Sequence, residues 1–431
     1  MNQLAEELNS VLKETAPGRL LSGLGKRFYF PKGIIAQSGE AKKSAYTANA
    51  TIGMAYSRGK PLILSAIAGS MPTLTPEQAV AYAPTAGVDQ VRSEWKKLIL
   101  RKNKSLNAGD ISLPVVVPGL TAGISLMADL FLDENQVMIA SDPCWDNYSL
   151  IFEERRAGKL RGVPFFSRGP GLDLDAVGRA VQEEAEKGAV RIILNFPNNP
   201  SGYSPTRSEA EALAGLFKAA AEGGADVLVL CDDAYFGLFY ENTIYPESIF
   251  SLLANLHEKI LAVKIDGPIK EDYVWGLRTG FVTFGSKGLG EEQQGALITK
   301  LMGAIRSSVS CANTPAQHII IKALEDPRTQ PEKIQFQEMM QRRYNAVKAF
   351  IAANPDHPVL TPLPFNSGYF MSFRCEKINA ESLRRELLSK HGIGAISLGE
   401  RCLRVAFSGL DEDQIPAVYR TIYDTAANLN P

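Results

Sequence analysis

Residues 189–235, AVRIILNFPNNPSGYSPTRSEAEALAGLFKAAAEGGADVLVLCDDAY, contain two apolar runs separated by one amphipathic stretch. The runs VRIILNFP and DVLVLCDD are short, rich in Val, Ile and Leu, and end in Asp, Asn or Pro, which is typical of buried parallel strands. Between them, apolar residues recur every three or four positions and glycines follow, which indicates a helix. The stretch therefore predicts a strand–helix–strand unit of a parallel sheet.

The same alternation extends outward from this unit, from about Pro61 to Asp326. QVMIASDP and KILAVKIDG have the same character as the two runs above, and LDLDAVGRAVQEEAEKG is a second helical stretch. We therefore expect an α/β fold with a mostly parallel sheet and helices on both faces, in a large domain over residues 59–326.

The pattern changes after a long helix that is predicted from about Pro331 to Asn354. GYFMSF, AISLG and LRVAFS then alternate with two helical stretches, which predicts a smaller C-terminal α+β domain over residues 327–431. Residues 1–58 form an N-terminal segment that we expect to join the smaller domain.

Composition narrows the class of protein. The chain has 431 residues, of which 45% are hydrophobic and 22% charged, a balance typical of globular proteins. A net charge of -1 without a long basic run argues against nucleic-acid binding, and no stretch approaches membrane-spanning length. The five cysteines form no CxxC pair and the N-terminus does not resemble a signal peptide, so we expect a cytoplasmic protein. The four histidines have no metal-ligand spacing, so no metal site is predicted.

Polar motifs follow several of the predicted strands. GLTAGIS follows VVVP, NNPSG follows VRIILNFP, DDAY follows DVLVLC, and PIKEDYVWGLRTG follows ILAVKIDG. In open parallel sheets, ligands bind beyond the carboxyl ends of the strands. A helix start that suits phosphate, an amide, an acid with a tyrosine, and a lysine are therefore expected at one place.

Taken together, these motifs resemble the class I/II aminotransferase family of pyridoxal-phosphate (PLP) enzymes, over nearly the whole chain and in the family's order. The resemblance implies the aspartate-aminotransferase-like type I PLP fold, with a seven-stranded type of sheet in the large domain. It also implies the cofactor pyridoxal 5'-phosphate and a homodimer. The implied activity is transfer of an amino group from an L-amino acid to a 2-oxo acid by a ping-pong mechanism.

Lys270 is the residue that the resemblance identifies as the Schiff-base lysine. Arg278 follows eight residues later in Gly-Leu-Arg, as in the family's motif. Lys264 is the rival lysine, but it lies within an apolar run and has a different distance to Arg278. Many family members have Ser-x-x-Lys with a serine that reaches the cofactor phosphate, whereas Gly267 occupies that position here.

Asp232 and Tyr235, in CDDAYFGL, resemble the family's D-x-A-Y element. By this resemblance Asp232 keeps the pyridine nitrogen protonated, which lets the ring accept electrons, and Tyr235 donates to the phenolic oxygen. Asp233 lies one step out of the motif. Asn199, in NNPSG, matches the asparagine that also bonds the phenolic oxygen, although such a sequence forms a turn in any protein.

The resemblance assigns the phosphate to a helix start, where free amide groups favour an anion. Gly119, Leu120 and Thr121 match the family's small-x-Thr, although Thr121 is also suited to be an ordinary N-cap. Arg278 would bond the same phosphate. Trp145 matches the aromatic residue that stacks on the ring, and core packing is the alternative role for it.

Further residues of the resemblance concern the partner subunit and the substrate. Tyr82 matches a tyrosine that reaches the phosphate of the neighbouring subunit. Arg404, in LRVAFS, matches the arginine that holds the substrate α-carboxylate, with Arg401 as its close neighbour in sequence. Gly53 and Asn199 would complete that site. Arg306 aligns loosely with the arginine that binds a distal carboxylate, and a helix-end arginine near carbonyl groups is the alternative.

The resemblance leaves two other functions open. The same fold hosts PLP-dependent lyases such as C–S lyases and decarboxylases, because the cofactor stabilises a carbanion whichever bond breaks. A catalytically silent relative that senses an amino acid is the third hypothesis.

Overall fold

The computed structural model describes residues 1–12, 27, 34–51, 53–70, 73–166 and 169–429. Parts of the predicted N-terminal segment, residues 13–26, 28–33 and 52, lie outside this description. The segment's described helices are α1 (Gln3–Leu12) and α4 (Ile34–Ser44).

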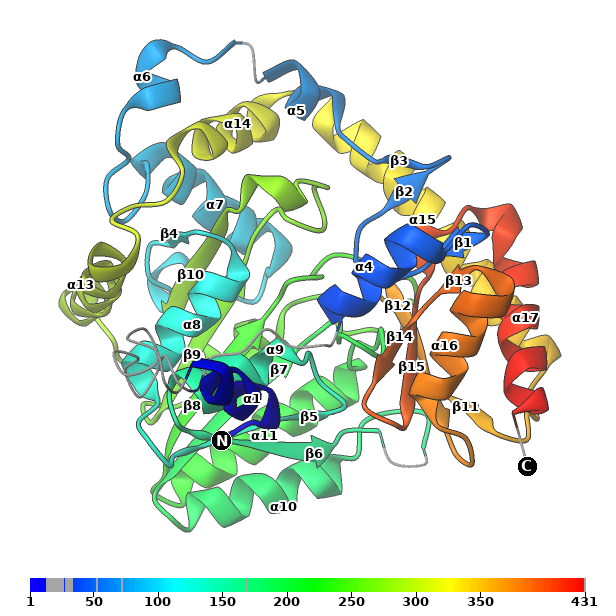
Figure 1. The fold of residues 1–431 in the computed structure, drawn as a ribbon. Helices are drawn as coiled ribbons and strands as arrows, with labels where there is room; N and C mark the ends of the chain where they lie inside the picture. The colour runs from blue at the N-terminus through cyan, green and yellow to red at the C-terminus, as the bar shows by residue number, and fades with distance from the viewer. Residues whose placement is uncertain (13–26, 28–33, 52, 71–72, 167–168, 430–431) are drawn as a thin grey trace.

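A seven-stranded sheet forms the centre of the molecule (Figure 1). Its strands, in spatial order, are β4 (Val115–Val117), β10 (Gly280–Gly285), β9 (Ile260–Asp266), β8 (Asp226–Asp232), β7 (Ala189–Asn195), β5 (Val137–Asp142) and β6 (Lys159–Pro164). The five strands from β9 to β6 run parallel to one another, and β10 runs antiparallel to both of its neighbours, β4 and β9. The predicted α/β fold with a mostly parallel sheet is confirmed.

Helices cover both faces of this sheet because successive residues of each strand point to opposite sides. In β8, Val227 and Val229 pack into one hydrophobic cluster, while Leu228 and Leu230 pack into another. The first cluster includes residues of α7 (Asp89–Lys102), α10 (Leu174–Ala185), α11 (Arg207–Glu222) and α12 (Ile249–Leu253). The second includes residues of α8 (Leu120–Phe131), the π-helical segment Leu150–Arg155 and α13 (Glu291–Ser308).

A four-stranded antiparallel sheet lies beside the large one, to the right in Figure 1. Its order is β11 (Leu360–Pro362), β12 (Phe370–Cys375), β15 (Cys402–Ala406) and β14 (Ile396–Leu398). A third hydrophobic cluster joins it to α15 (Thr329–Ala353), α16 (Ala380–His391) and α17 (Ile415–Asn428). The helix expected from about residue 331 to 354 corresponds to α15.

The N-terminal part of the chain contacts this smaller unit. β1 (Ala48–Asn49) pairs in parallel with β13 (Ile393–Gly394), and Gln37 of α4 bonds both the backbone and the side chain of Ser397. Chain segments more than 300 residues apart in sequence therefore lie side by side, with α4 and β1 against the C-terminal unit in Figure 1.

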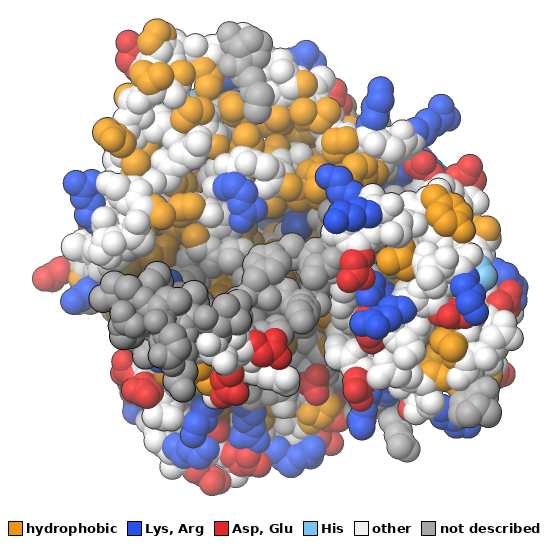
Figure 2. All heavy atoms as spheres, viewed as in Figure 1, with side chains coloured by type: hydrophobic (Ala, Val, Ile, Leu, Met, Phe, Trp, Pro, Cys, Tyr) orange, Lys and Arg blue, Asp and Glu red, His pale blue; other side chains and the backbone are white. Residues whose placement is uncertain are grey.

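Exposed apolar side chains gather on one part of the surface. Figure 2 shows hydrophobic atoms over α5 (Ser65–Ser70), α6 (Pro76–Val80) and α14 (Thr314–Glu325). Ile63, Val80 and Tyr82 are exposed by 52%, 84% and 91%. Patches of this kind are typical of surfaces that another protein covers. Among the described helices, none is long and apolar enough to cross a membrane.

Candidate active site

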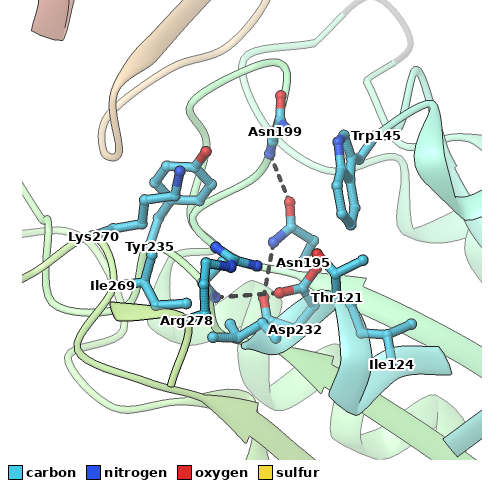
Figure 3. Close-up of a pocket in the computed structure, with 12 residues that line it drawn as sticks. Thr121, Ile124, Trp145, Asn195, Asn199, Asp232, Tyr235, Ile269, Lys270 and Arg278 are labelled. Atoms are coloured by element: carbon cyan, nitrogen blue, oxygen red, sulfur yellow. Dashed lines mark hydrogen bonds between the residues drawn. The ribbon is translucent and has the colours of Figure 1, made fainter. Parts of the chain in front are cut away.

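A cavity of about 220 Å³ lies where β7, β8 and β9 end and α8 begins (Figure 3). These strands end at the same edge of the sheet, which is where ligands bind in open parallel sheets. The cavity is lined by Leu120, Thr121, Ile124, Trp145, Asn195, Asn199, Asp232, Ala234, Tyr235, Ile269, Lys270 and Arg278. Four motifs that are far apart in the sequence therefore meet here, as predicted from the ends of the strands.

Lys270 lies in the loop that follows β9, and its amine faces the cavity. Nζ donates to the carbonyl oxygen of Gly53 at 2.9 Å and lies 5.0 Å from the centre of the Tyr235 ring. Burial, followed by the positive charges of Arg404 and Arg278, lowers the pKa of Lys270 to about 7. A large fraction of this amine is therefore neutral at physiological pH, as a nucleophilic amine must be.

The rival residues Lys264 and Asp233 contact each other. Nζ of Lys264 forms a buried ion pair with Asp233 and lies 3.6 Å from Oδ2 of Asp266. Ser248 donates to Asp233 at 2.6 Å, and Trp95 donates to Asp266 at 3.0 Å. Burial lowers the pKa of Lys264, but the two carboxylates outweigh this effect and raise it. Lys264 is therefore a charged structural residue, and neither it nor Asp233 lines the cavity.

Asp232 is the last residue of β8 and is buried at the bottom of the cavity. Tyr148 donates to its Oδ2 at 2.5 Å, and the backbone N–H of Ala234 donates to Oδ1 at 3.3 Å. Burial raises the pKa of Asp232 to about 6, against the opposite effect of the Tyr148 hydrogen bond. The carboxylate is thus held in one orientation toward the cavity.

Tyr148 is a site residue that the sequence motifs did not identify. It lies three residues after Trp145, and the two rings form an edge-to-face pair with centres 5.5 Å apart. Trp145 lines the cavity, so it is not a simple core residue. Figure 3 shows Trp145 across the cavity from Lys270 and Tyr235. The run DPCWDNY contains both aromatic residues, but nothing in it shows that the tyrosine reaches Asp232.

A chain of hydrogen bonds joins Asp232 to Arg404. The side chain of Asn195 donates to the carbonyl oxygen of Asp232 at 2.8 Å and accepts from the backbone N–H of Asn199 at 2.7 Å (Figure 3). Oδ1 of Asn199 accepts from Nη1 of Arg404 at 2.8 Å. Asn195 was not predicted as a site residue, and it fixes the turn that presents Asn199.

Arg404 lies on β15 and is 2% exposed. Nη2 donates to the carbonyl oxygen of Thr51 at 3.0 Å, and the guanidinium carbon lies 4.3 Å from the centre of the Phe370 ring. Its buried Nε has no hydrogen-bond partner among the described residues. A buried donor without a partner indicates that an acceptor is missing, and a carboxylate is such an acceptor. Arg401, by contrast, is exposed.

Gly53 provides room between these groups. A Cβ atom there would lie 3.1 Å from Cζ of Phe370 and 3.2 Å from Oη of Tyr235. The close approach of this backbone brings its carbonyl oxygen to Lys270. Gly53 therefore lies between the amine and the aromatic residues near Arg404, and its part in a carboxylate site stays a prediction.

The start of α8 and Arg278 form one end of the cavity. Gly119 is the N-cap of α8 and has φ +87°, so the interpretation of Thr121 as the N-cap is wrong. Thr121 lies in the first turn and lines the cavity. A Cβ atom on Gly119 would lie only 2.6 Å from Nη2 of Arg278, so the guanidinium lies directly against the helix start. Both groups favour an anion.

Gly53, Gly119 and Arg404 contact residues that line the cavity without being among them, whereas two other predicted residues lie on the surface of this chain. Tyr82 is exposed on the surface, and Arg306 is exposed on α13, where it donates to Ser310. The local contact of Arg306 agrees with the alternative role as a helix-end arginine. For Tyr82 a role toward a neighbouring subunit stays a prediction.

The described residues fit pyridoxal phosphate. The site holds an amine with a lowered pKa, a buried carboxylate, an aromatic residue opposite the amine and a cationic end that suits a phosphate. No group of three or more His, Cys, Asp or Glu side chains suited to a metal ion is found among the described residues.

The chain matches the family described as "Aminotransferase class I and II" over residues 55–422. It is 24% identical over 294 residues to a probable aspartate/prephenate aminotransferase of Aquifex aeolicus, covering 66% of this chain and 67% of that protein. It is 23% identical over 248 residues to a probable N-acetyl-LL-diaminopimelate aminotransferase of Bacillus subtilis, covering 58% of this chain and 56% of that protein.

Solved structures show the same fold. An aminotransferase from Anaerococcus prevotii superposes with a TM-score of 0.82 at 23% sequence identity, covering 94% of this chain and 99% of that one. With a family match over most of its length, the chain belongs to the class I and II aminotransferases, a family of pyridoxal-phosphate-dependent enzymes.

Proposed function

We propose that the protein transfers an amino group from an L-amino acid to a 2-oxo acid in two half-reactions. In the first, the amino acid leaves its amino group on the enzyme, and in the second, a 2-oxo acid removes it. The observation that carries this proposal is that an amine of pKa about 7, Lys270, shares one site with a buried arginine, Arg404, whose Nε has no partner.

The residues that line the cavity would hold the cofactor. Lys270 would hold it covalently through Nζ, and Arg278, Thr121 and the first amides of α8 would hold its phosphate. Asp232 would hold the pyridine nitrogen, and Tyr235 and Asn199 the phenolic oxygen. When bound, the cofactor supplies a positively charged ring that withdraws electrons from the substrate Cα.

Arg404 determines how the amino acid is oriented. Its planar guanidinium binds a carboxylate through two parallel hydrogen bonds, which fixes the rotation of the substrate about Cα. The ion pair with Arg404 would stabilise the negative charge of the carboxylate, and this charge disappears when carbon dioxide forms, so decarboxylation is disfavoured. The Cα–H bond then becomes the one that faces Lys270.

Lys270 would move the proton. Its free amine would accept the proton from Cα as a general base, and its pKa of about 7 suits that task near neutral pH. Asn199 couples the two ends of the site, because it accepts from Arg404 while its backbone is held by Asn195.

The test is transfer of labelled nitrogen from glutamate and aspartate to a panel of 2-oxo acids by the purified holoenzyme. We expect labelled amino acid from at least one acceptor and none from a Lys270→Ala variant. Lys287→Ala, at an exposed lysine after β10, is the matched control and should keep wild-type activity. Pyruvate and ammonia from serine or cysteine, without labelled product, would establish a lyase. Binding of amino acids without any turnover would establish a sensing relative.

A further inference from the structure

Three glycines from separate segments pack together at the cationic end of the cavity. Gly119 precedes α8, Gly267 follows β9, and Gly280 begins β10. A Cβ atom on Gly267 would lie 2.9 Å from the carbonyl oxygen of Thr279 and 3.1 Å from Cα of Gly280. The first of these distances is shorter than real Cβ contacts, and both neighbours are backbone atoms that cannot rotate away.

Gly280 contacts the helix start in the same way. Its Cβ atom would lie 3.0 Å from the carbonyl carbon of Gly119 and 3.1 Å from the backbone nitrogen of Leu120. These distances are tighter than most real Cβ contacts, so a side chain at either Gly267 or Gly280 would push the segment around Arg278 a few tenths of an ångström away from the first turn of α8. Protein interiors are packed densely enough that such a displacement is not absorbed locally.

We propose that Gly267 and Gly280 are positioning residues for the cofactor phosphate. The lack of side chains lets the ends of β9 and β10 approach α8, so that the first amides of the helix and the guanidinium of Arg278 face one anion. This inference rests on the proposed position of the phosphate at α8. The inference goes beyond that position because it states what shapes the phosphate site: close backbone packing at Gly267, and not a hydroxyl group at position 267.

This packing predicts that a serine at position 267 weakens phosphate binding. If the position only lacked a hydrogen-bond donor, the serine would strengthen it. Many relatives of the family have a serine at the position of Gly267, and a serine hydroxyl would ordinarily add a hydrogen bond to the phosphate. Here the Cβ atom of the same serine would lie 2.9 Å from the carbonyl oxygen of Thr279, so that backbone must shift and Gly267→Ser should weaken phosphate binding.

The experiment measures the affinity of the apoenzyme for pyridoxal phosphate and for pyridoxal, which lacks the phosphate, by quenching of tryptophan fluorescence. For Gly267→Ser we expect affinity for pyridoxal phosphate to fall about tenfold, as when one charge-assisted hydrogen bond is lost, with little change for pyridoxal. Gly280→Ala should show the same phosphate-selective loss. Gly276→Ser is the matched control in the same loop, because its Cβ would meet no heavy atom within 4 Å.

The outcomes separate this inference from the proposed function. Wild-type protein that binds both compounds equally would contradict the placement of the phosphate itself. A wild type that prefers pyridoxal phosphate, with Gly267→Ser binding it as tightly or more tightly, would overturn only the role of the glycines. If Gly267→Ser and Gly280→Ala both fail to fold while Gly276→Ser folds, the glycines serve the fold and the inference is wrong.

Discussion

At the scale of single residues, the charged neighbours of a lysine decide whether its amine is neutral or charged. Lys270 and Lys264 are six residues apart and burial disfavours the charge of both, yet their pKa values move in opposite directions. Lys270 has two arginines as its main charged neighbours, whereas Lys264 has two carboxylates. The same amine is therefore a nucleophile in the first environment and a structural cation in the second.

The lowered pKa of Lys270 predicts how cofactor capture depends on pH. Raising the pH deprotonates the amine, so the rate at which apoenzyme captures pyridoxal phosphate should rise with pH, with a midpoint near 7. Stopped-flow absorbance at a series of pH values measures this. Arg404→Met removes one neighbouring positive charge and should move the midpoint upward. A wild-type midpoint above about 9, near that of an ordinary lysine, would contradict the assignment.

Tyr148 predicts a second pH effect. Its hydroxyl donates to Asp232 and stabilises the ionised carboxylate, so Tyr148→Phe should raise the pKa of Asp232 above its value of about 6. In the proposed function the ionised form of Asp232 holds the pyridine nitrogen, so the acid limb of kcat/KM should move to higher pH, by about one unit for a lost hydrogen bond to a charged group.

Tyr245→Phe is the control for this variant, because it also removes a tyrosine hydroxyl, which there contacts Ser251 far from the cavity. Its pH profile should match that of the wild type. If Tyr148→Phe lowers activity equally at all pH values, Tyr148 supports the structure without changing the pKa of Asp232.

At the scale of elements, β8 and β9 separate the charged groups that line the cavity from those that support the structure. Asp232 closes β8 on the cavity side, and the next residue, Asp233, turns to the other side and pairs with Lys264 of β9. This buried pair ties the ends of both strands together directly beneath the loops that present Asp232 and Lys270. Its removal should therefore affect stability more than chemistry.

Lys264→Met tests that separation. Removing the cation leaves Asp233 and Asp266 buried without their charged partner, which should cost about 3–5 kcal/mol of stability and lower the urea midpoint of unfolding. Lys287→Met, at an exposed position, should leave the midpoint unchanged. After borohydride reduction of the folded variant, peptide mapping should still find the cofactor on Lys270. A label that disappears with Lys264, in a protein that stays folded, would show that we have assigned the wrong lysine.

At the scale of the whole molecule, we propose that the exposed apolar surface over α5, α6 and α14 (Figure 2) is the interface of the homodimer that the family resemblance implies. Tyr82 follows α6 and is 91% exposed, an unusual position for a tyrosine without a partner protein. The resemblance predicts that it reaches the phosphate site of the neighbouring subunit, and it does not line the cavity of its own chain. A second copy of the chain would have to bring it there.

Mixing two inactive variants tests this arrangement. In a dimer of Tyr82→Ala with Lys270→Ala, one site combines the intact lysine of the first chain with the intact tyrosine of the second. Random exchange at equal concentrations makes half of the dimers mixed, so about a quarter of the wild-type sites should return. Sedimentation should show a dimer throughout. A fully active monomer, or no recovery from mixed dimers, would contradict the shared site.

Local sequence determined the elements, because strands, helices and turns leave periodic patterns over a few neighbouring residues. The choice of Lys270 came from the resemblance of its spacing to Arg278 to the motif of the family. The spacing of Lys270 and Arg278 and the polar ends of the strands predicted which side chains meet at one edge. The division of the chain at residues 58 and 326, and the individual roles of the site residues, stay predictions.

Tertiary structure alone decided the contacts between distant segments. The antiparallel insertion of β10 between β4 and β9, the bond from Tyr148 to Asp232, and the pairing of Lys264 with Asp233 depend on how strands pack, which no local pattern encodes. The same is true of Gly267, which the sequence presents as a missing serine. The structure shows that backbone atoms from β10 occupy the space a side chain would need, because van der Waals exclusion acts between atoms that are close in space and not in sequence.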